Sequence, residues 1–335
     1  MTPIMLCLGL LLGSAVVIYL ACEFFVNGVE WVGRRLSVGE QATGSILAAF
    51  GTALPESVVT FVAVVFGATA AQKAIGVGAA LGGPLVLSTI AYATVGVVLL
   101  ICRRRLPSTD GVRAEFKALS RDQGWFLAIF AAKIALGLTA FAVKPWLGVL
   151  FLGAYAAYFW KEMRGGDGGE DSELEPLKLT PRRAVPATWA AIAQTVGALV
   201  VIFFASRLFV RQLDVLGPLW GIRPQLLALL LSPIATELPE TLNAIIWVRQ
   251  GKHRLALANI SGAMMIQATV PTALGLFFTP WLLDRSLIVA AAVTAMAVMA
   301  MFVAFRRGFV SRGFLAAMAL FYLVFIGLIL ALHLG

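Results

Sequence analysis

The chain has 335 residues, of which 60% are apolar and only 13% are charged. An average soluble protein is about half apolar and about a quarter charged, so this composition excludes an ordinary soluble domain. The net charge of +9 would suggest a nucleic-acid partner in a soluble protein, but in a membrane protein it reports on topology, and we expect no nucleic acid.

Long apolar runs separated by charged or turn residues predict an all-α polytopic membrane protein. A spanning helix takes about 20 residues, so the length allows roughly ten transmembrane helices and no separate soluble domain. The first run begins without a preceding Lys or Arg, which disfavours a cleaved signal peptide. We expect spans at about residues 3–33, 39–68, 74–102, 123–143, 145–161, 185–210, 223–249, 253–277, 282–305 and 313–334.

One polar connector, residues 162–184, combines several glycines with six acidic residues. Its composition predicts a flexible cytoplasmic linker. It separates a first half of five helices, residues 1–161, from a second half of five, residues 185–335. An odd number of helices in each half predicts that the two halves are inserted in opposite directions, as inverted repeats common in secondary transporters.

The distribution of the 26 Lys and Arg residues gives an orientation. If the turn at Arg34 and Arg35 is cytoplasmic, the cytoplasmic connections carry roughly three times as many basic residues as the opposite face. We therefore expect both termini outside, in a plasma membrane that corresponds to a bacterial inner membrane. The sequence does not indicate an oligomeric state.

A short motif recurs in the second and seventh predicted spans. Residues 44–56 read GSILAAFGTALPE and residues 228–240 read ALLLSPIATELPE, which share T-x-L-P-E. Inserting a carboxylate at the bilayer centre costs at least about 2.5 to 3.5 kcal/mol of free energy. We therefore expect a counter-charge or a function for Glu56, Glu237 and Glu240. No Lys or Arg is expected at their depth, although Lys133 is the nearest intramembrane base. Bound cations or protons are the simplest compensation.

The prolines of the two motifs supply further oxygen atoms. Pro55 and Pro239 lack the N–H group that would bond the carbonyl four residues earlier, which frees the oxygens of Gly51 and Ala235. Hydroxyls of Thr52 and Thr236 stand beside them. We expect both spans to be broken here, with carboxylate, carbonyl and hydroxyl oxygens facing a common site. This hard oxygen set suits calcium or sodium.

Three polar residues of the first span, Glu23, Asn27 and Glu30, share one helix face. They either line a cation access path or anchor the cytoplasmic end of the helix. Neither His253 nor His333 falls in a predicted midplane, so neither is a candidate metal ligand or base.

These residues resemble the cation/calcium exchanger superfamily, most closely the sodium/calcium exchanger membrane proteins. Those proteins have ten helices in two inverted halves, each with the motif G-T-S-L-P-E; here the corresponding stretches are GTALPE and ATELPE. The resemblance implies that Glu56 and Glu240 are the paired calcium-binding carboxylates, with Thr52 and Thr236 beside them.

The chain also departs from that family. The following helices of the family carry G-S-N-x-x-N or G-S-N-x-x-D, whereas here Gly83 and Pro84 replace the first Ser and Asn, and only Gln267 keeps an amide in the second half. In exchange Glu237 replaces the family's Ser. The divalent pair is retained, while part of the sodium set is missing.

The leading hypothesis is therefore a secondary antiporter, not an enzyme, that exchanges Ca²⁺ or a similar divalent cation for Na⁺ by alternating access. The alternative is coupling to H⁺, because clustered carboxylates in a dry site repel one another and Glu237 would then carry a proton. A non-transporting scaffold and an intramembrane enzyme are lesser alternatives. The expected partners are the lipid bilayer and the transported cations, with no cofactor.

Overall fold

The computed structural model describes residues 3–35, 48–102, 110–165, 174–183, 185–308 and 310–334. Within these ranges the regular structure is entirely helical, which confirms the all-α fold class. The first half contains α1 (Pro3–Arg35), α3 (Ala48–Phe66), α4 (Ala70–Val86), the π-helix η2 (Leu87–Ala91), α5 (Tyr92–Ile101), α6 (Asp110–Gly137), the short 3₁₀ helix η3 (Lys144–Leu147) and α7 (Gly148–Gly165). The second half contains α8 (Thr188–Trp220), α9 (Pro224–Thr236), α10 (Leu238–Arg249), α11 (His253–Phe278), α12 (Arg285–Arg307), α13 (Arg312–Ala317) and α14 (Ala319–Ala331).

Six helical stretches of the described chain are long and apolar enough to cross a membrane. Their outward side chains are largely apolar, as a lipid-facing surface requires; examples are Leu12, Phe204 and Leu323, each more than 60% exposed. The chain is therefore an integral membrane protein. The stretches are Ile4–Arg34, Ala70–Ile101, Thr188–Trp220, His253–Phe278, Arg285–Arg307 and Arg312–Ala331.

Two expected span boundaries are wrong. The span expected at 123–143 is part of α6, which begins at Asp110 and ends at Gly137. The span expected to end at residue 210 continues in α8 to Trp220, where Gly221 adopts a left-handed conformation. Hydropathy locates the apolar part of a helix, whereas backbone hydrogen bonding extends α6 back to Asp110 and α8 on to Trp220 through polar residues.

The two proline-containing motifs differ in their backbones. In the second half the chain breaks at Glu237, the residue between α9 and α10, with φ −98° and ψ 0°. In the first half α3 is a continuous helix from Ala48 to Phe66 that includes Pro55. The expected break of the second span is therefore wrong, since a membrane helix accommodates one proline by local adjustment. Residues 39–47 of that expected span lie outside the described ranges.

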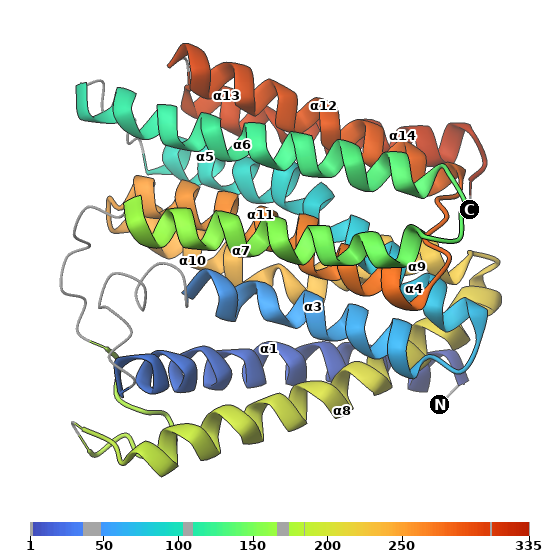
Figure 1. Cartoon of the computed structure of the whole chain (residues 1–335), viewed down its shortest axis with the longest axis horizontal. Helices are drawn as coiled ribbons and strands as arrows, with labels where there is room; N and C mark the ends of the chain where they lie inside the picture. The colour runs from blue at the N-terminus through green and yellow to red at the C-terminus, as the bar shows by residue number, and fades with distance from the viewer. Residues whose placement is uncertain are drawn as a thin grey trace.

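The helices run side by side in layers (Figure 1). The long helices α1 and α8 pack along each other at one edge, and α12 to α14 occupy the opposite edge. Between these edges α4 packs on α9 and α3 packs on α11. In both pairs a helix of the first half contacts a helix of the second half. The two proline-containing motifs are consequently brought into the middle of the molecule.

Close packing of α4 against α9 depends on a glycine. A Cβ atom on Gly82 would lie 2.5 Å from the carbonyl oxygen of Leu229 and 2.8 Å from Cγ of Pro233. Small residues allow helix backbones to approach closely in membranes. The oxygen of Leu229 is the one that Pro233 leaves without its helical donor.

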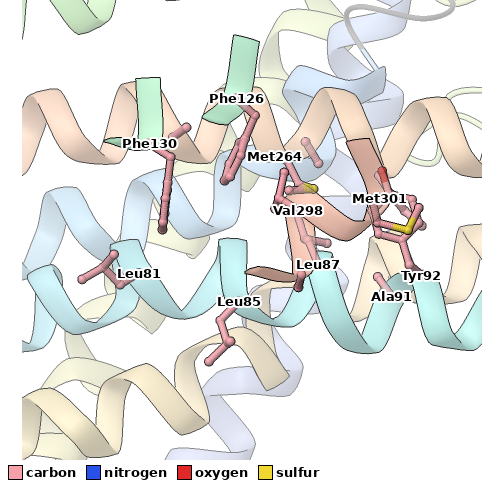
Figure 2. Packing of buried hydrophobic residues seen from close by; sticks show 14 of the residues in the cluster. Leu81, Leu85, Leu87, Ala91, Tyr92, Phe126, Phe130, Met264, Val298 and Met301 are labelled. Atoms are coloured by element: carbon pink, nitrogen blue, oxygen red, sulfur yellow. The ribbon is translucent and has the colours of Figure 1, made fainter. Parts of the chain in front are cut away.

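The larger apolar cluster surrounds α4, η2 and α5 (Figure 2). Phe126 and Phe130 of α6 point toward the helix that carries Leu81 and Leu85, and the two rings stack with centroids 5.1 Å apart. A second cluster joins α1, α3, α4, α8 and α9. The members of both clusters are buried, and close packing of such residues holds the helices in place around the polar residues between them.

Residues 174–183, the second part of the expected flexible linker, are held against the first helix. The side-chain oxygen of Asn27 accepts a 2.9 Å hydrogen bond from the backbone N–H of Lys178, and the Lys178 ammonium pairs with Glu23 at 2.9 Å. Leu177 is completely buried. Of the two readings of the polar face on α1, these contacts favour anchoring. The expected flexibility does not apply to this part, and residues 166–173 and 184 lie outside the described ranges.

Candidate functional site

Glu56 lies in the middle of α3 with no solvent exposure. It directly follows Pro55 in a mostly apolar helix, and its carboxylate is buried away from water. Of its two carboxylate oxygens, Oε2 accepts a hydrogen bond from the Thr236 hydroxyl at 2.6 Å. Oε1 has no hydrogen-bond partner among the described residues. A buried carboxylate with a free oxygen is suited to bind a cation or a proton.

The break between α9 and α10 brings three polar residues of the second motif into the interior. Thr236 and Glu237 are each 1% exposed and Glu240 is 0% exposed. Proline at the second position of α10 favours the start of a new helix there, and its missing N–H removes a bond that would continue α9. Glu240 lies in the first turn of α10, where the helix dipole favours negative charge.

A chain of hydrogen bonds connects the two halves of the molecule at this point. The Thr236 hydroxyl lies 2.6 Å from Glu56 Oε2 and 3.0 Å from Glu237 Oε1. The Gln267 amide nitrogen on α11 donates to Glu237 Oε2 at 2.7 Å. Gln267 is itself fully buried. Four side chains from α3, α11 and the α9–α10 junction therefore form one polar cluster in an apolar interior.

The Gln267 side chain occupies the space that the first half leaves open at Gly83. A Cβ atom on Gly83 would lie 2.5 Å from Gln267 Oε1 and 2.8 Å from its Cδ atom. The oxygen donors expected at Gly83 and Pro84 from the family pattern are thus absent, and the amide of Gln267 reaches that position from the other half. This oxygen has no partner among the described residues.

The expected site residues are placed as follows. Glu56, Thr236, Glu237 and Gln267 are linked in that order by hydrogen bonds, and Glu240 lies one helical turn beyond Glu237. Their part in ion binding stays a prediction. The Glu237 side chain is buried, so it does not face an aqueous vestibule. Gly51 and Thr52 lie in α3 and Ala235 in α9, but their side chains are outside the description.

Two residues near the site were not expected there. Ser232, one turn before Thr236 on α9, is fully buried and lies close to the Glu56 carboxylate. Its spacing of four residues from Thr236 is the signal that could have identified it. Lys133 is also fully buried and interacts electrostatically with Glu56. The expectation that no base lies near the depth of the three glutamates is therefore wrong.

The cluster offers oxygen ligands of several kinds. Among the described residues no group of three or more His, Cys, Asp or Glu side chains is close enough to hold a metal ion alone. A cation here would need carboxylate oxygens together with hydroxyl, amide and main-chain oxygens. Hard cations with flexible coordination, such as Ca²⁺ and Na⁺, accept such mixed sets.

Comparison with known sequences identifies related proteins. A family model described as sodium/calcium exchanger protein matches residues 6–161 and 190–331. The chain is 26% identical over 287 residues to the inner membrane protein YrbG of Escherichia coli strain K12, covering 82% of this chain and 80% of that protein.

Two solved structures share the fold. The H⁺/Ca²⁺ exchanger CAX superposes with a TM-score of 0.74 at 17% identity, over 97% of this chain and 82% of that one. The sodium-calcium exchanger NCX_Mj, soaked with Na⁺ and Sr²⁺, superposes with a TM-score of 0.60 at 16% identity, over 97% of this chain and 99% of that one. The fold of cation exchangers therefore extends over the whole described molecule.

Proposed function

The chain belongs to the sodium/calcium exchanger protein family, and from this premise we propose that it is a secondary antiporter for Ca²⁺ or a similar divalent cation. The family is one of transporters rather than enzymes. The observation that carries the proposal is the buried contact between Glu56 and Thr236, which joins the two T-x-L-P-E motifs in the interior. A midplane site between two related halves is the usual arrangement for alternating access.

The proposed architecture is ten transmembrane helices in two inverted halves, with both termini outside. The recurring motif supports it, as does the exchange of partners in which α4 packs on α9 and α3 on α11. The proposed location is the plasma membrane, which in bacteria is the inner membrane; the relative YrbG is named an inner membrane protein.

The proposed ligands of the divalent cation are Glu56 and Glu240. Thr236, Glu237 and Gln267 are proposed to complete the site, together with Thr52 and the main-chain oxygens of Gly51 and Ala235. Two carboxylates match the charge of a divalent cation, and Ca²⁺ accepts six to eight oxygens in an irregular arrangement. The unpartnered Oε1 atoms of Glu56 and Gln267 are available for this purpose.

The geometry at Thr236 supports protons as the coupling ion. Its hydroxyl carries a single hydrogen, yet its oxygen lies within hydrogen-bonding distance of Glu56 Oε2, Glu237 Oε1 and the Ser232 carbonyl oxygen. A hydroxyl with one hydrogen can donate to only one of these oxygens with good geometry. A proton on Glu56 or Glu237 would let that carboxyl group donate to the hydroxyl oxygen. Binding of a divalent cation would expel this proton, which is how H⁺ exchange would operate.

Sodium is the second candidate for the coupling ion. It is favoured by the sequence GTALPE at residues 51–56, which resembles the motif of sodium/calcium exchangers, and by the mixed hydroxyl and carbonyl oxygens around Thr236. Sodium accepts such neutral oxygen ligands as readily as calcium does. Against it stands the loss of the Ser and Asn oxygens at Gly83 and Pro84.

The test is a flux measurement on the purified protein reconstituted in liposomes. Uptake of radiolabelled Ca²⁺ is measured under an imposed pH gradient and, separately, under an imposed Na⁺ gradient, with the membrane potential clamped by K⁺ and valinomycin. We expect uphill Ca²⁺ movement with the pH gradient. Movement with the Na⁺ gradient alone would make Na⁺ the coupling ion. No uphill movement of Ca²⁺, Sr²⁺, Mn²⁺ or Mg²⁺ under either gradient would refute the antiporter function.

A further inference from the structure

Lys133 on α6 is a fully buried base that the proposed cation ligands do not include. Its ammonium nitrogen donates to the carbonyl oxygen of Ala80 on α4 at 2.9 Å. The nitrogen also lies 5.4 Å from the ring centroid of Phe130 and 5.8 Å from that of Trp281. A charged side chain in a membrane interior is costly and therefore indicates a function. A carbonyl oxygen and two aromatic faces are surroundings that stabilise a cation.

The ammonium group lies at the depth of the carboxylates. Ala80 precedes Gly83 by three residues of α4, a rise of about 4.5 Å. Gly83 in turn faces the amide of Gln267, which holds Glu237 at 2.7 Å. Lys133 and the polar cluster thus flank the same turn of α4. Figure 2 shows Phe130, one turn before Lys133 on α6, pointing toward this stretch of α4.

Lys133 acts on the site through space rather than through a closed ion pair. Its charge interacts with the carboxylate of Glu56. In the part of the chain that the structure describes, no ion pair within 4 Å includes Lys133. In a dry interior such an interaction is not screened by water or salt. The positive charge therefore contributes to the potential at the site and leaves the carboxylate oxygens open to another cation.

Lys133 changes the net charge of the proposed cation site. With every group ionised, Glu56, Glu237 and Glu240 carry three negative charges and Lys133 carries one positive charge. The sum of minus two equals the charge that a divalent cation neutralises. Without the lysine the sum would be minus three, which favours a trivalent cation, because the charge of a site is a main determinant of its preference among hard cations.

We propose that Lys133 is a specificity-determining residue that balances the third carboxylate, so that the site selects divalent over trivalent cations. This inference rests on the proposed exchange of divalent cations at the same site. Glu237 is the acidic residue by which this chain departs from the family motif, and Lys133 compensates its negative charge.

The test compares Ca²⁺ with La³⁺ in full-length purified protein. Affinities are obtained from ion-dependent thermal stabilisation in detergent and, in liposomes, from inhibition of Ca²⁺ flux by La³⁺. In Lys133→Met we expect the preference for La³⁺ over Ca²⁺ to rise by about tenfold or more. Lys133→Arg keeps the charge and is expected to keep the wild-type preference.

The double variant Lys133→Met with Glu237→Gln separates charge from structure. It restores the sum of minus two, and we expect its preference to return to within about threefold of wild type. An unchanged preference in Lys133→Met, or a shift that Glu237→Gln does not reverse, would overturn the proposal. If Lys133→Met does not fold, Glu237→Gln alone is compared with the double variant: the single variant should bind Ca²⁺ about tenfold more weakly than the double. Equal binding would overturn the proposal.

The same measurements separate this inference from the proposed function. A wild-type protein that neither transports Ca²⁺ nor is stabilised by it overturns both. A wild-type protein that transports Ca²⁺, with an unchanged La³⁺ preference in Lys133→Met, overturns only the role of Lys133.

Discussion

The hydroxyl of Thr236 lies 2.6 Å from a carboxylate oxygen of Glu56, a residue 180 positions earlier in the chain. Each belongs to one copy of the recurring T-x-L-P-E motif. The contact is buried and its partners sit on α3 and at the end of α9. A hydrogen bond that only stabilised the fold would need one polar partner in each motif. Here the hydrogen bonds continue from Thr236 to Glu237 and on to Gln267.

The first prediction concerns the paired carboxylates. Glu56→Gln or Glu240→Gln should reduce Ca²⁺ flux to background while the protein keeps its fold. Removing one charge from a buried, compensated set costs about 3–5 kcal/mol, which corresponds to at least about a hundredfold loss of affinity. Flux in liposomes and elution in size-exclusion chromatography are measured together. Comparable flux in both variants at equal reconstitution would show that the pair is structural.

The second prediction concerns the shared hydroxyl. Thr236→Val retains the shape of the side chain but removes the donor to Glu56, so the apparent affinity for Ca²⁺ should fall by about tenfold to a hundredfold, as for hydrogen bonds to charged groups. The matched control is Thr294→Val on α12, a buried threonine whose hydroxyl, among the described residues, donates to the Ala290 carbonyl oxygen within its own helix. An equal effect in both variants would mean that the loss is one of general stability.

The third prediction concerns proton coupling through Glu237. Protons compete with the divalent cation, so wild-type Ca²⁺ uptake should rise between about pH 6 and pH 8, the range that buried carboxylates can reach. Glu237→Ser removes one competing carboxylate and should flatten this rise. The measurement is initial uptake against pH at a fixed gradient. Identical profiles in the two proteins would reject a proton role for Glu237 and return Na⁺ to first place.

The fourth prediction concerns the space at Gly83. In Gly83→Ala the new methyl group would collide with the Gln267 amide, which must move away from Glu237. We expect lower Ca²⁺ affinity and a stability loss of about 1–3 kcal/mol, as for other overpacked sites. Gly153→Ala on α7 is the control, because nothing lies within 4 Å of its added Cβ. Unchanged affinity in Gly83→Ala would show that the position of the Gln267 amide does not matter.

The fifth prediction concerns the docked segment that follows the linker. Asn27→Leu removes the acceptor of the Lys178 N–H group and should release residues 174–183 from α1. Tryptic cleavage after Lys178 should become about tenfold faster, as expected for loss of about 1–2 kcal/mol of local stability. Ser14→Ala on the same helix removes only a bond to the Leu11 carbonyl oxygen. Cleavage at the wild-type rate in Asn27→Leu would show that other contacts hold the segment.

The membrane location and the helical fold follow from the sequence alone, because apolar runs of this length have no stable alternative in lipid. The candidate carboxylates were equally accessible to sequence reasoning: Glu56 and Glu240 are costly in a span, and their recurrence with Thr and Pro indicates a shared task. The sequence also indicates Gln267 as the amide that remains at the positions of the family motif in its helix. These inferences need only local composition and spacing.

The tertiary structure decided which groups meet. Whether Pro55 breaks its helix depends on the packing around α3, and the helix is continuous there although the similar sequence at Pro239 begins a new one. Contact between Gln267 and the space at Gly83 joins residues of different halves, and no periodicity within either helix encodes it. The proximity of Lys133 to Glu56 has the same origin. Local patterns determine what a helix can bury, but only the packing of helices against one another determines which buried charges share a site.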